Sequence, residues 1–198
     1  MLNVQAARSR AKRSCCYEVE PSATLSASAG YGRGMSVPKR DPIGPGQESV
    51  WDYPRPLRLE PSSRHIRVEL DGVIVADCKR ALRVLETSHP PTYYVNPDDV
   101  DWDLIELASG GSFCEWKGQA TYCSVQTATA RVERGAWFYE SPSARFADLA
   151  NYLAFYPALF SCFVDAEPVT PQPGQFYGGW VTSDLAGPFK GSPGTMHW

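Results

Sequence analysis

Glycine, proline and polar turns divide the chain between residues 65 and 165 into short apolar segments, and this spacing restricts the fold more than any other feature. Residues 66–70 alternate between apolar and charged side chains, Asp71-Gly72 is a typical hairpin turn, and residues 73–76 supply a returning strand. Short strands that alternate with such turns are typical of antiparallel β proteins. We therefore predict a mainly β fold, a compact antiparallel domain.

Further strands are expected at 92–95, 102–107, 112–116, 119–127, 130–133, 136–139 and 160–165. The segment 81–86 fits either a strand or a turn of helix, and its periodicity leaves this choice open. One packed α-helix is predicted after Ser141, which can cap a helix with Pro142 in the first position. Its apolar stripe consists of Phe146, Leu149, Ala150 and Leu153.

The first 34 residues differ from the rest, because they are rich in Ser, Ala and Gly and carry five basic residues against two acidic ones, a local charge of +3. An Arg-rich segment of this kind suits an organelle transit peptide. The alternative is that translation begins at Met35, since the residues that follow it resemble an ordinary N-terminus. We favour a true start at Met35 over Met1, and expect residues 1–34 to be disordered and functionally silent.

The predicted β domain covers residues 65–167 and has an extension on each side. Residues 35–64 are dense in Pro and Gly and read as an extended arm anchored by Trp51 and Tyr53, with a loose linker as the alternative. Residues 168–198 form a Pro/Gly-rich extension with several large rings, which we expect to pack back on the domain.

Composition excludes several classes of protein. The net charge is -3 over 198 residues, and it becomes -6 once the basic first segment is removed, so we expect no nucleic acid partner. No run of 18 apolar residues occurs, so no membrane span is predicted. Six irregularly spaced cysteines without a secretory signal favour reduced thiols in the cytoplasm.

A metal site is not expected, because the chain has no C-x-x-C pair and its three histidines, His65, His89 and His197, are scattered. The glycine pairs near Trp180 and Phe189 do not match a phosphate-binding loop, and we interpret them as tight turns. The sequence indicates no particular cofactor.

Chemically useful side chains gather in residues 112–118 and 137–139. Cys114 lies close in sequence to Lys117, and a cation near a thiol lowers the thiol pKa, although a buried and inert cysteine is the alternative. Lys117 could hold an anionic ligand group, pair with Glu86, or remain a solvated turn lysine. Glu86, with Arg80 and Glu115, supplies candidate acid, base and anion-binding groups.

The aromatic residues could form a cage or simply a core. Those we single out as candidate ligand contacts are Tyr94, Trp116, Tyr122, Trp137 and Tyr139.

Five blocks in order resemble the DUF427 domain family: residues 73–82, 85–94, 113–118, 136–139 and 152–156. The resemblance covers roughly 65–167 and implies a β-tent type of fold, a pair of antiparallel sheets that elsewhere houses zinc sites, sulfoxide reductases and aromatic-cage ligand pockets. Where the family's block reads Cys-Pro-Tyr-Lys-Gly, this chain keeps Cys114 and Lys117 but has Glu115 and Trp116 between them.

The family is sometimes labelled nucleotidyltransferase-like. No paired Asp-x-Asp follows a glycine turn here, so that mechanism has no support in the residues. The zinc role of β-tent relatives is not carried over, because the chain lacks their paired C-x-x-C motifs.

Three functional hypotheses follow. The first is that a pocket lined by Arg80, Glu86, Tyr94, Cys114, Lys117, Trp137 and Tyr139 binds a small polar or anionic metabolite. The second is a thiol-dependent enzyme that uses Cys114 as nucleophile or redox centre. The third is an interaction module or homodimer in which arm and extension cover a second subunit.

Overall fold

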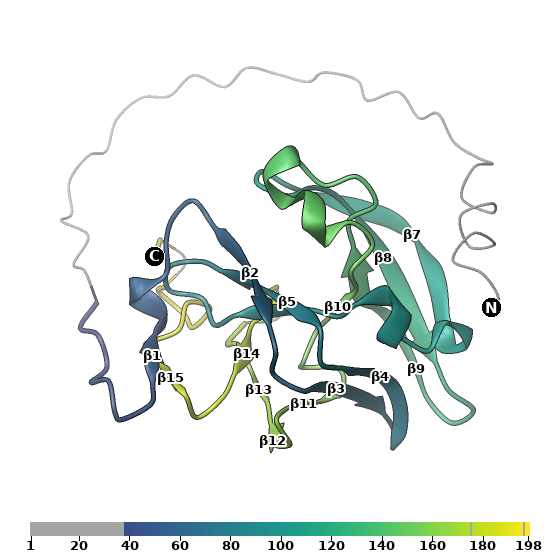
Figure 1. Cartoon of the computed structure of the whole chain (residues 1–198), viewed down its shortest axis with the longest axis horizontal. Helices are drawn as coiled ribbons and strands as arrows, with labels where there is room; N and C mark the ends of the chain where they lie inside the picture. Colours follow the sequence, from purple (N-terminus) through teal and green to yellow (C-terminus); the bar gives the residue numbers. More distant parts are fainter. Residues whose placement is uncertain (1–37, 175, 196) are drawn as a thin grey trace. The chain divides into compact units, whose positions relative to one another are not determined.

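The computed structural model describes residues 38–174, 176–195 and 197–198 (Figure 1). The predictions made for residues 1–34, including the choice between Met1 and Met35, lie outside the described residues. From residue 39 onward the chain forms one compact unit of strands and short helical turns.

Antiparallel sheets dominate this unit, which confirms the mainly β fold class. The four-stranded sheet that carries Cys114, Tyr122 and Trp137 has the order β10 (Ala154–Phe155), β9 (Arg131–Phe138), β8 (Gly118–Gln126), β7 (Ile105–Cys114). A second four-stranded sheet has the order β12 (Glu167–Pro168), β11 (Ser161–Val164), β3 (Ile66–Leu70), β4 (Val73–Cys78). A three-stranded sheet has the order β2 (Arg58–Ser62), β5 (Ala81–Leu85), β6 (Thr92–Tyr94), so the segment at 81–86 is a strand.

Two small pairs complete the described strands. β13 (Thr170–Pro171) pairs antiparallel with β14 (Trp180–Val181), and β1 (Glu48–Ser49) pairs parallel with β15 (Leu185–Ala186). The arm at 35–64, expected to be extended without regular structure, therefore contains β1, the whole of β2 and a short 3-10 turn.

All helical segments within the described residues are 3-10 turns: η1 (Val50–Asp52), η2 (Pro97–Asp99), η3 (Trp102–Leu104) and η4 (Ala144–Leu149). The predicted strand at 102–107 thus begins as η3 and becomes β7 at Ile105. The predicted α-helix after Ser141 was wrong in type and length, since η4 ends at Leu149 and Phe146 has non-helical angles of φ -114° and ψ 22°.

The apolar stripe behind that prediction has another cause. Phe146 and Leu149 are buried in one core cluster, while Leu153 is buried in the other. Leu153 exchanges backbone hydrogen bonds with Val95, so the chain has already become extended there. The helical spacing of Phe146, Leu149 and Leu153 therefore arose from a 3-10 segment followed by extended chain, and Ala150 between them is only partly buried.

Two core clusters lie on opposite faces of the same strands, because successive side chains of a strand point to opposite sides. Tyr93 and Ala136 belong to the first cluster, whereas the next residues, Tyr94 and Trp137, belong to the second. We call the second one the aromatic cluster; its buried members are Leu57, Val84, Tyr94, Ala120, Trp137, Tyr139, Phe146, Leu149 and Ala154. This alternation selects which residues can face a site.

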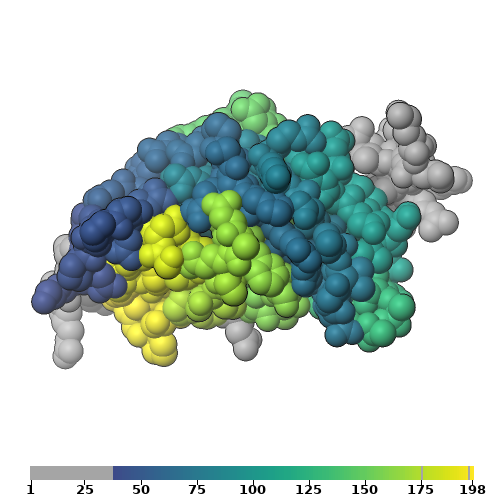
Figure 2. All heavy atoms as spheres, turned by 60° about the horizontal axis from the view of Figure 1, so that its bottom comes forward, coloured from purple at the N-terminus to yellow at the C-terminus, as the bar shows by residue number. Residues whose placement is uncertain are grey.

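The extension contacts the rest of the unit through its rings. Trp180 is fully buried and its Nε1 donates to the carbonyl of Phe155 at 3.3 Å. Trp51 of the arm donates to the Pro188 carbonyl at 2.8 Å, and its ring lies 5.4 Å from that of Trp198. Figure 2 shows the yellow C-terminal segment against the dark blue arm. Phe176 differs from the expected packing, since it is 81% exposed.

No helix in the part of the chain that the structure describes is long and apolar enough to cross a membrane.

Candidate functional site

A cavity of about 340 Å³ lies beside the aromatic cluster. Strands β5 to β9 and the extension supply its walls. Its lining residues are Leu57, Val84, Glu86, His89, Pro90, Thr92, Tyr94, Ser112, Phe113, Cys114, Lys117, Ala120, Tyr122, Trp137, Tyr139, Tyr156, Gln172, Phe176, Tyr177 and Gly178.

Lys117 enters the cavity from the tight turn between β7 and β8. The following residue, Gly118, has φ +99°, a conformation that side chains disfavour, so the hairpin needs glycine here. Ser143 holds the turn from outside: its N–H donates to the Lys117 carbonyl at 3.1 Å and its Oγ donates to the Trp116 carbonyl at 2.6 Å. The backbone of Lys117 is therefore held in place by the segment that leads into η4.

The ammonium of Lys117 lies 5.8 Å from the centre of the Tyr139 ring, within cation–π range. Burial alone lowers the lysine pKa, but Tyr94, Cys114 and Glu86 outweigh it, so the pKa lies above its ordinary value. Lys117 therefore stays charged at neutral pH. Within the described residues it forms no ion pair with a carboxylate.

Aromatic rings form most of the interior wall. The Trp137 ring lies 4.4 Å from that of Tyr156 and 6.3 Å from that of Tyr94, which in turn lies 6.4 Å from that of Tyr139. Burial, with smaller contributions from neighbouring groups, raises the pKa of Tyr139 and of Tyr156 above the ordinary value. These phenols therefore remain neutral hydrogen-bonding groups at physiological pH.

Tyr122 is held at the wall by two polar neighbours. Its hydroxyl and that of Ser112 lie 2.9 Å apart, and the Arg134 guanidinium stacks 4.0 Å from the ring centre. The ring is thus oriented before any ligand enters.

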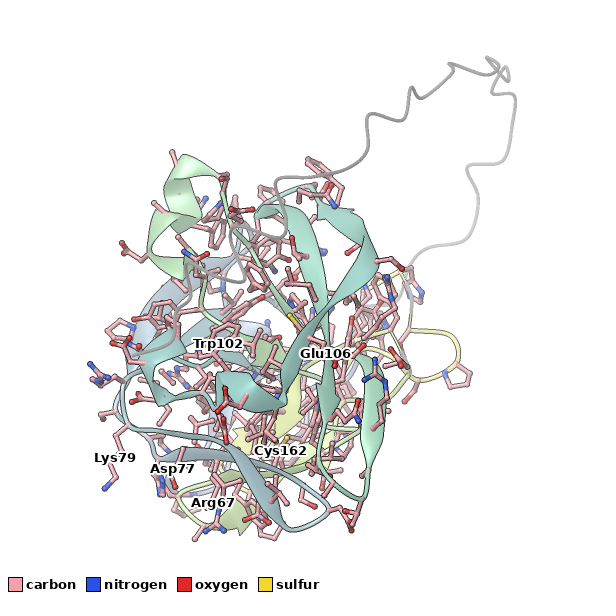
Figure 3. All side chains as sticks on the ribbon, turned by 90° about the vertical axis from the view of Figure 1, so that its right-hand side faces the viewer. Arg67, Asp77, Lys79, Trp102, Glu106 and Cys162 are labelled. Carbon is pink, nitrogen blue, oxygen red and sulfur yellow. The ribbon has the colours of Figure 1, made fainter. Side chains whose placement is uncertain are left out.

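Cys114 is half-buried and lines the cavity, unlike three other cysteines of the described chain. Cys78, Cys123 and Cys162 are buried in the first core cluster. Burial raises the pKa of Cys78 and Cys162 and raises that of Cys123 to about 12. Figure 3 shows Cys162 inside the unit, behind the strands. Cys114 therefore differs from these three in its access to the cavity.

Glu86 and His89 form a polar end of the cavity. The Glu86 carboxylate forms an ion pair with the Arg55 guanidinium at 2.8 Å, and it lies 4.0 Å from His89 Nδ1. The Nδ1 of His89 lies 3.0 Å from the Thr87 carbonyl, which can only accept, so Nδ1 carries the proton. Burial lowers the His89 pKa more than Glu86 raises it, so the ring is neutral at pH 7 and its Nε2 is a hydrogen-bond acceptor.

The extension closes one side of the cavity with Gln172 and residues 176–178. The buried Gln172 side chain donates to the Lys190 carbonyl at 2.8 Å. The Tyr177 ring lies edge-on to His89, with centres 5.2 Å apart, and Phe176 lies edge-on to Tyr177 at 5.4 Å. A continuous series of rings therefore leads outward from His89.

The cavity brings together seven of the ten residues singled out from the sequence: Glu86, Tyr94, Cys114, Lys117, Tyr122, Trp137 and Tyr139. Arg80, Glu115 and Trp116 do not line it. Arg80 is an exposed turn residue whose guanidinium pairs with Asp99 at 3.1 Å, and Trp116 occupies the turn beside Lys117 and packs against the aromatic cluster.

The other upstream cations also lie elsewhere. Lys79 is exposed and points away from the unit in Figure 3. Arg83 pairs with Glu48 and Glu60. Neither Lys79 nor Arg83 lines the cavity, whereas Lys117 lines it together with Cys114.

Sequence reasoning missed His89, Phe113, Tyr156 and the wall built by the extension. His89 follows Glu86 by three residues, and that spacing was the available signal. Residues 176–178 gave no sequence signal of their place in the site, because more than thirty positions separate them from β9, where Trp137 lies.

No group of three or more His, Cys, Asp or Glu side chains suited to a metal ion occurs among residues 38–174, 176–195 and 197–198. The cavity offers an ammonium, a neutral imidazole, a carboxylate, a thiol and several phenols. Such a donor set suits hydrogen bonding to a small polar molecule.

Comparison with known proteins adds a family assignment. No curated protein matches the chain. A family model described as a domain of unknown function, DUF427, matches residues 58–169, more than half of the chain. The match contains most of the cavity, including Glu86, Cys114 and Lys117, and ends before the wall formed by the extension. The chain belongs to the DUF427 family.

Proposed function

We propose that the protein binds a small polar or anionic metabolite in the aromatic-walled cavity. The observation that carries the proposal is Lys117, a charged and partly buried ammonium that faces the cavity over the Tyr139 ring and has no carboxylate ion-pair partner in the described chain. An ion in a low-dielectric wall attracts an opposite charge far more strongly than one in water.

The charge balance of the cavity supports an anionic ligand. The Glu86 carboxylate is already paired with Arg55, and His89 is neutral at pH 7. The ammonium of Lys117 is therefore left as a positive charge at the wall. A carboxylate, sulfate or phosphate group would neutralise it with a charge-assisted hydrogen bond.

Size and lining are consistent with a small ligand. Ligand pockets commonly measure roughly 300–1,000 Å³ and have mostly apolar walls with a few polar groups. This cavity, at about 340 Å³, lies near the lower limit and has that mixture.

A thermal-shift and calorimetry screen with nucleotides, sugars and carboxylates tests the proposal. A ligand that binds only the folded chain adds about 2.7 kcal/mol of stability at about 100 times Kd. Lys117→Met removes the charge while keeping most of the unbranched side chain, and we expect it to weaken anion binding about tenfold or more. Lys79→Met, at an exposed lysine outside the cavity, is the matched control and should change nothing. Equal binding by both variants would contradict the proposal.

A second candidate is a thiol-dependent enzyme that uses Cys114 as nucleophile or redox centre. Its support is that Cys114 lines the cavity beside Lys117, while Cys78, Cys123 and Cys162 are buried. Turnover of a bound ligand that disappears in Cys114→Ser, with ligand affinity retained, would favour this candidate over binding alone.

A further inference from the structure

Two large rings stand exposed at the mouth of the cavity. Phe113, near the end of β7, is 75% exposed, and Phe176, in the extension, is 81% exposed. They are the most exposed large hydrophobic side chains among the described residues, and both line the cavity. Exposed rings give up the free energy that burial would provide, so a pair of them at a cavity mouth indicates an occupant that covers them.

Ring contacts toward the interior of the cavity hold Phe176 in place. Phe176 packs edge-on against Tyr177, whose ring meets His89 inside the cavity. Two residues further on, Gly178 lies against the indole of Trp137. The backbone that carries Phe176 is thus part of the cavity wall.

Polarity differs between the wall and the mouth. The cation, Lys117, is partly buried on the wall, whereas the rings of Phe113 and Phe176 are open to solvent. A ligand that satisfies both must carry an anionic group at one end and a flat apolar group at the other. A simple inorganic anion would leave the two rings in water.

The exposed apolar surface at the mouth is too small for a protein partner. The other exposed large hydrophobics are Ile43, Val73, Ile74, Leu107 and Leu159, and none of them lines the cavity. Specific protein interfaces bury roughly 1,200–2,000 Å² in total, which two phenyl rings do not approach. The observations therefore favour a small molecule.

We propose that the ligand is an aromatic anion, with its carboxylate or phosphate at Lys117 and its ring between Phe113 and Phe176. This inference rests on the proposed function and names the ligand class. Because Phe176 lies beyond residue 169, where the family match ends, the extension supplies half of the ring recognition. Phe113 and Phe176 are then residues that determine specificity.

Isothermal titration with acetate, phenylacetate and phenylacetamide tests this, since the three probes differ only in the ring or the charge. We expect phenylacetate to bind about tenfold more tightly than either of the others. Phe113→Ala and Phe176→Ala should each weaken phenylacetate about three- to tenfold and leave acetate unchanged. Both side chains are exposed, so neither variant should impair folding. Leu159→Ala, at an exposed site outside the cavity, is the control.

The outcomes separate the two proposals. Equal affinity for acetate and phenylacetate, with both lost in Lys117→Met, would overturn the ring recognition and keep the anion site. Tight binding of phenylacetamide would overturn the aromatic-anion proposal and leave a site for a small polar molecule. No binding of any probe would overturn the aromatic-anion proposal alone, since the proposed function is tested with the wider ligand screen. Probe binding that Lys117→Met and the two Phe→Ala variants leave unchanged would overturn both proposals.

Discussion

A Cβ atom at position 178 would lie 2.4 Å from Cη2 of Trp137, so the glycine lets the extension lie directly on the indole. Gly178→Ala must displace either the extension or the ring, and overpacking of this kind costs about 1–3 kcal/mol. We expect a lower midpoint in urea denaturation. The double variant with Trp137→Phe should recover part of the loss, because the smaller ring leaves room for the methyl group. Strictly additive losses would show that the two residues do not interact.

Ser143 is expected to matter for the site although it does not line the cavity. Ser143→Ala removes the hydrogen bond to the Trp116 carbonyl and should cost about 0.5 kcal/mol, since the serine is exposed. Because this bond holds the turn that carries Lys117, the affinity for an anionic ligand should fall a few-fold. Ser141→Ala, which alters a neighbouring exposed serine, is the control and should leave both quantities unchanged.

Cysteine labelling should discriminate sharply among the four thiols of the described chain. In a Cys15→Ser, Cys16→Ser background, iodoacetamide should modify Cys114 first, because Cys78, Cys123 and Cys162 are buried and their pKa values are raised. A ligand in the cavity should slow the reaction. Mass spectrometry of peptides gives the order, and modification of all four at one rate would refute the assignment.

His89 should make stability depend on pH in a defined window. Its folded-state pKa is lowered, so the unfolded chain takes up its proton first as pH falls. Its contribution is therefore complete above the ordinary histidine pKa of about 6.5 and is lost progressively below it. His89→Asn can keep a donor toward the Thr87 carbonyl but does not titrate. Denaturation midpoints between pH 8 and about pH 5 should fall less steeply for this variant, and identical slopes would contradict the assignment.

At lower pH the folded state loses stability for a second reason, which is independent of His89. The pKa of Asp165 is lowered first by the hydrogen bond from the His65 N–H and then by the Arg64 guanidinium. Burial raises the pKa of Asp184, but hydrogen bonds from Thr182 and Arg64 outweigh it and lower the pKa. Their contribution is present above the ordinary aspartate pKa of about 3.9 and disappears as pH falls through the lowered values. Arg64→Met should therefore reduce the steepness of acid unfolding below about pH 4, measured by circular dichroism. The same profile in wild type and variant would rule out this role.

Local sequence was sufficient wherever neighbouring residues decide the structure. The alternation in 66–70 and the Asp71-Gly72 turn predicted the β3–β4 hairpin, because side-chain period and turn chemistry are properties of a few adjacent residues. The same period places Tyr94 and Trp137 on one face of the structure and their neighbours Tyr93 and Ala136 on the other.

Only the tertiary structure decided the rest, since a long-range contact leaves no trace in local spacing. The stripe from Phe146 to Leu153 looked helical, although Phe146 and Leu149 are buried by a 3-10 turn and Leu153 is buried in extended chain that pairs with Val95. Arg80 pairs with Asp99 on the surface, although its sequence position suggested the cavity. Sheet pairing and the packing of the extension bring His89 and residues 176–178 to the same cavity wall as Lys117 and Trp137. These residues are far apart in the sequence, so their contact depends on the whole packed core.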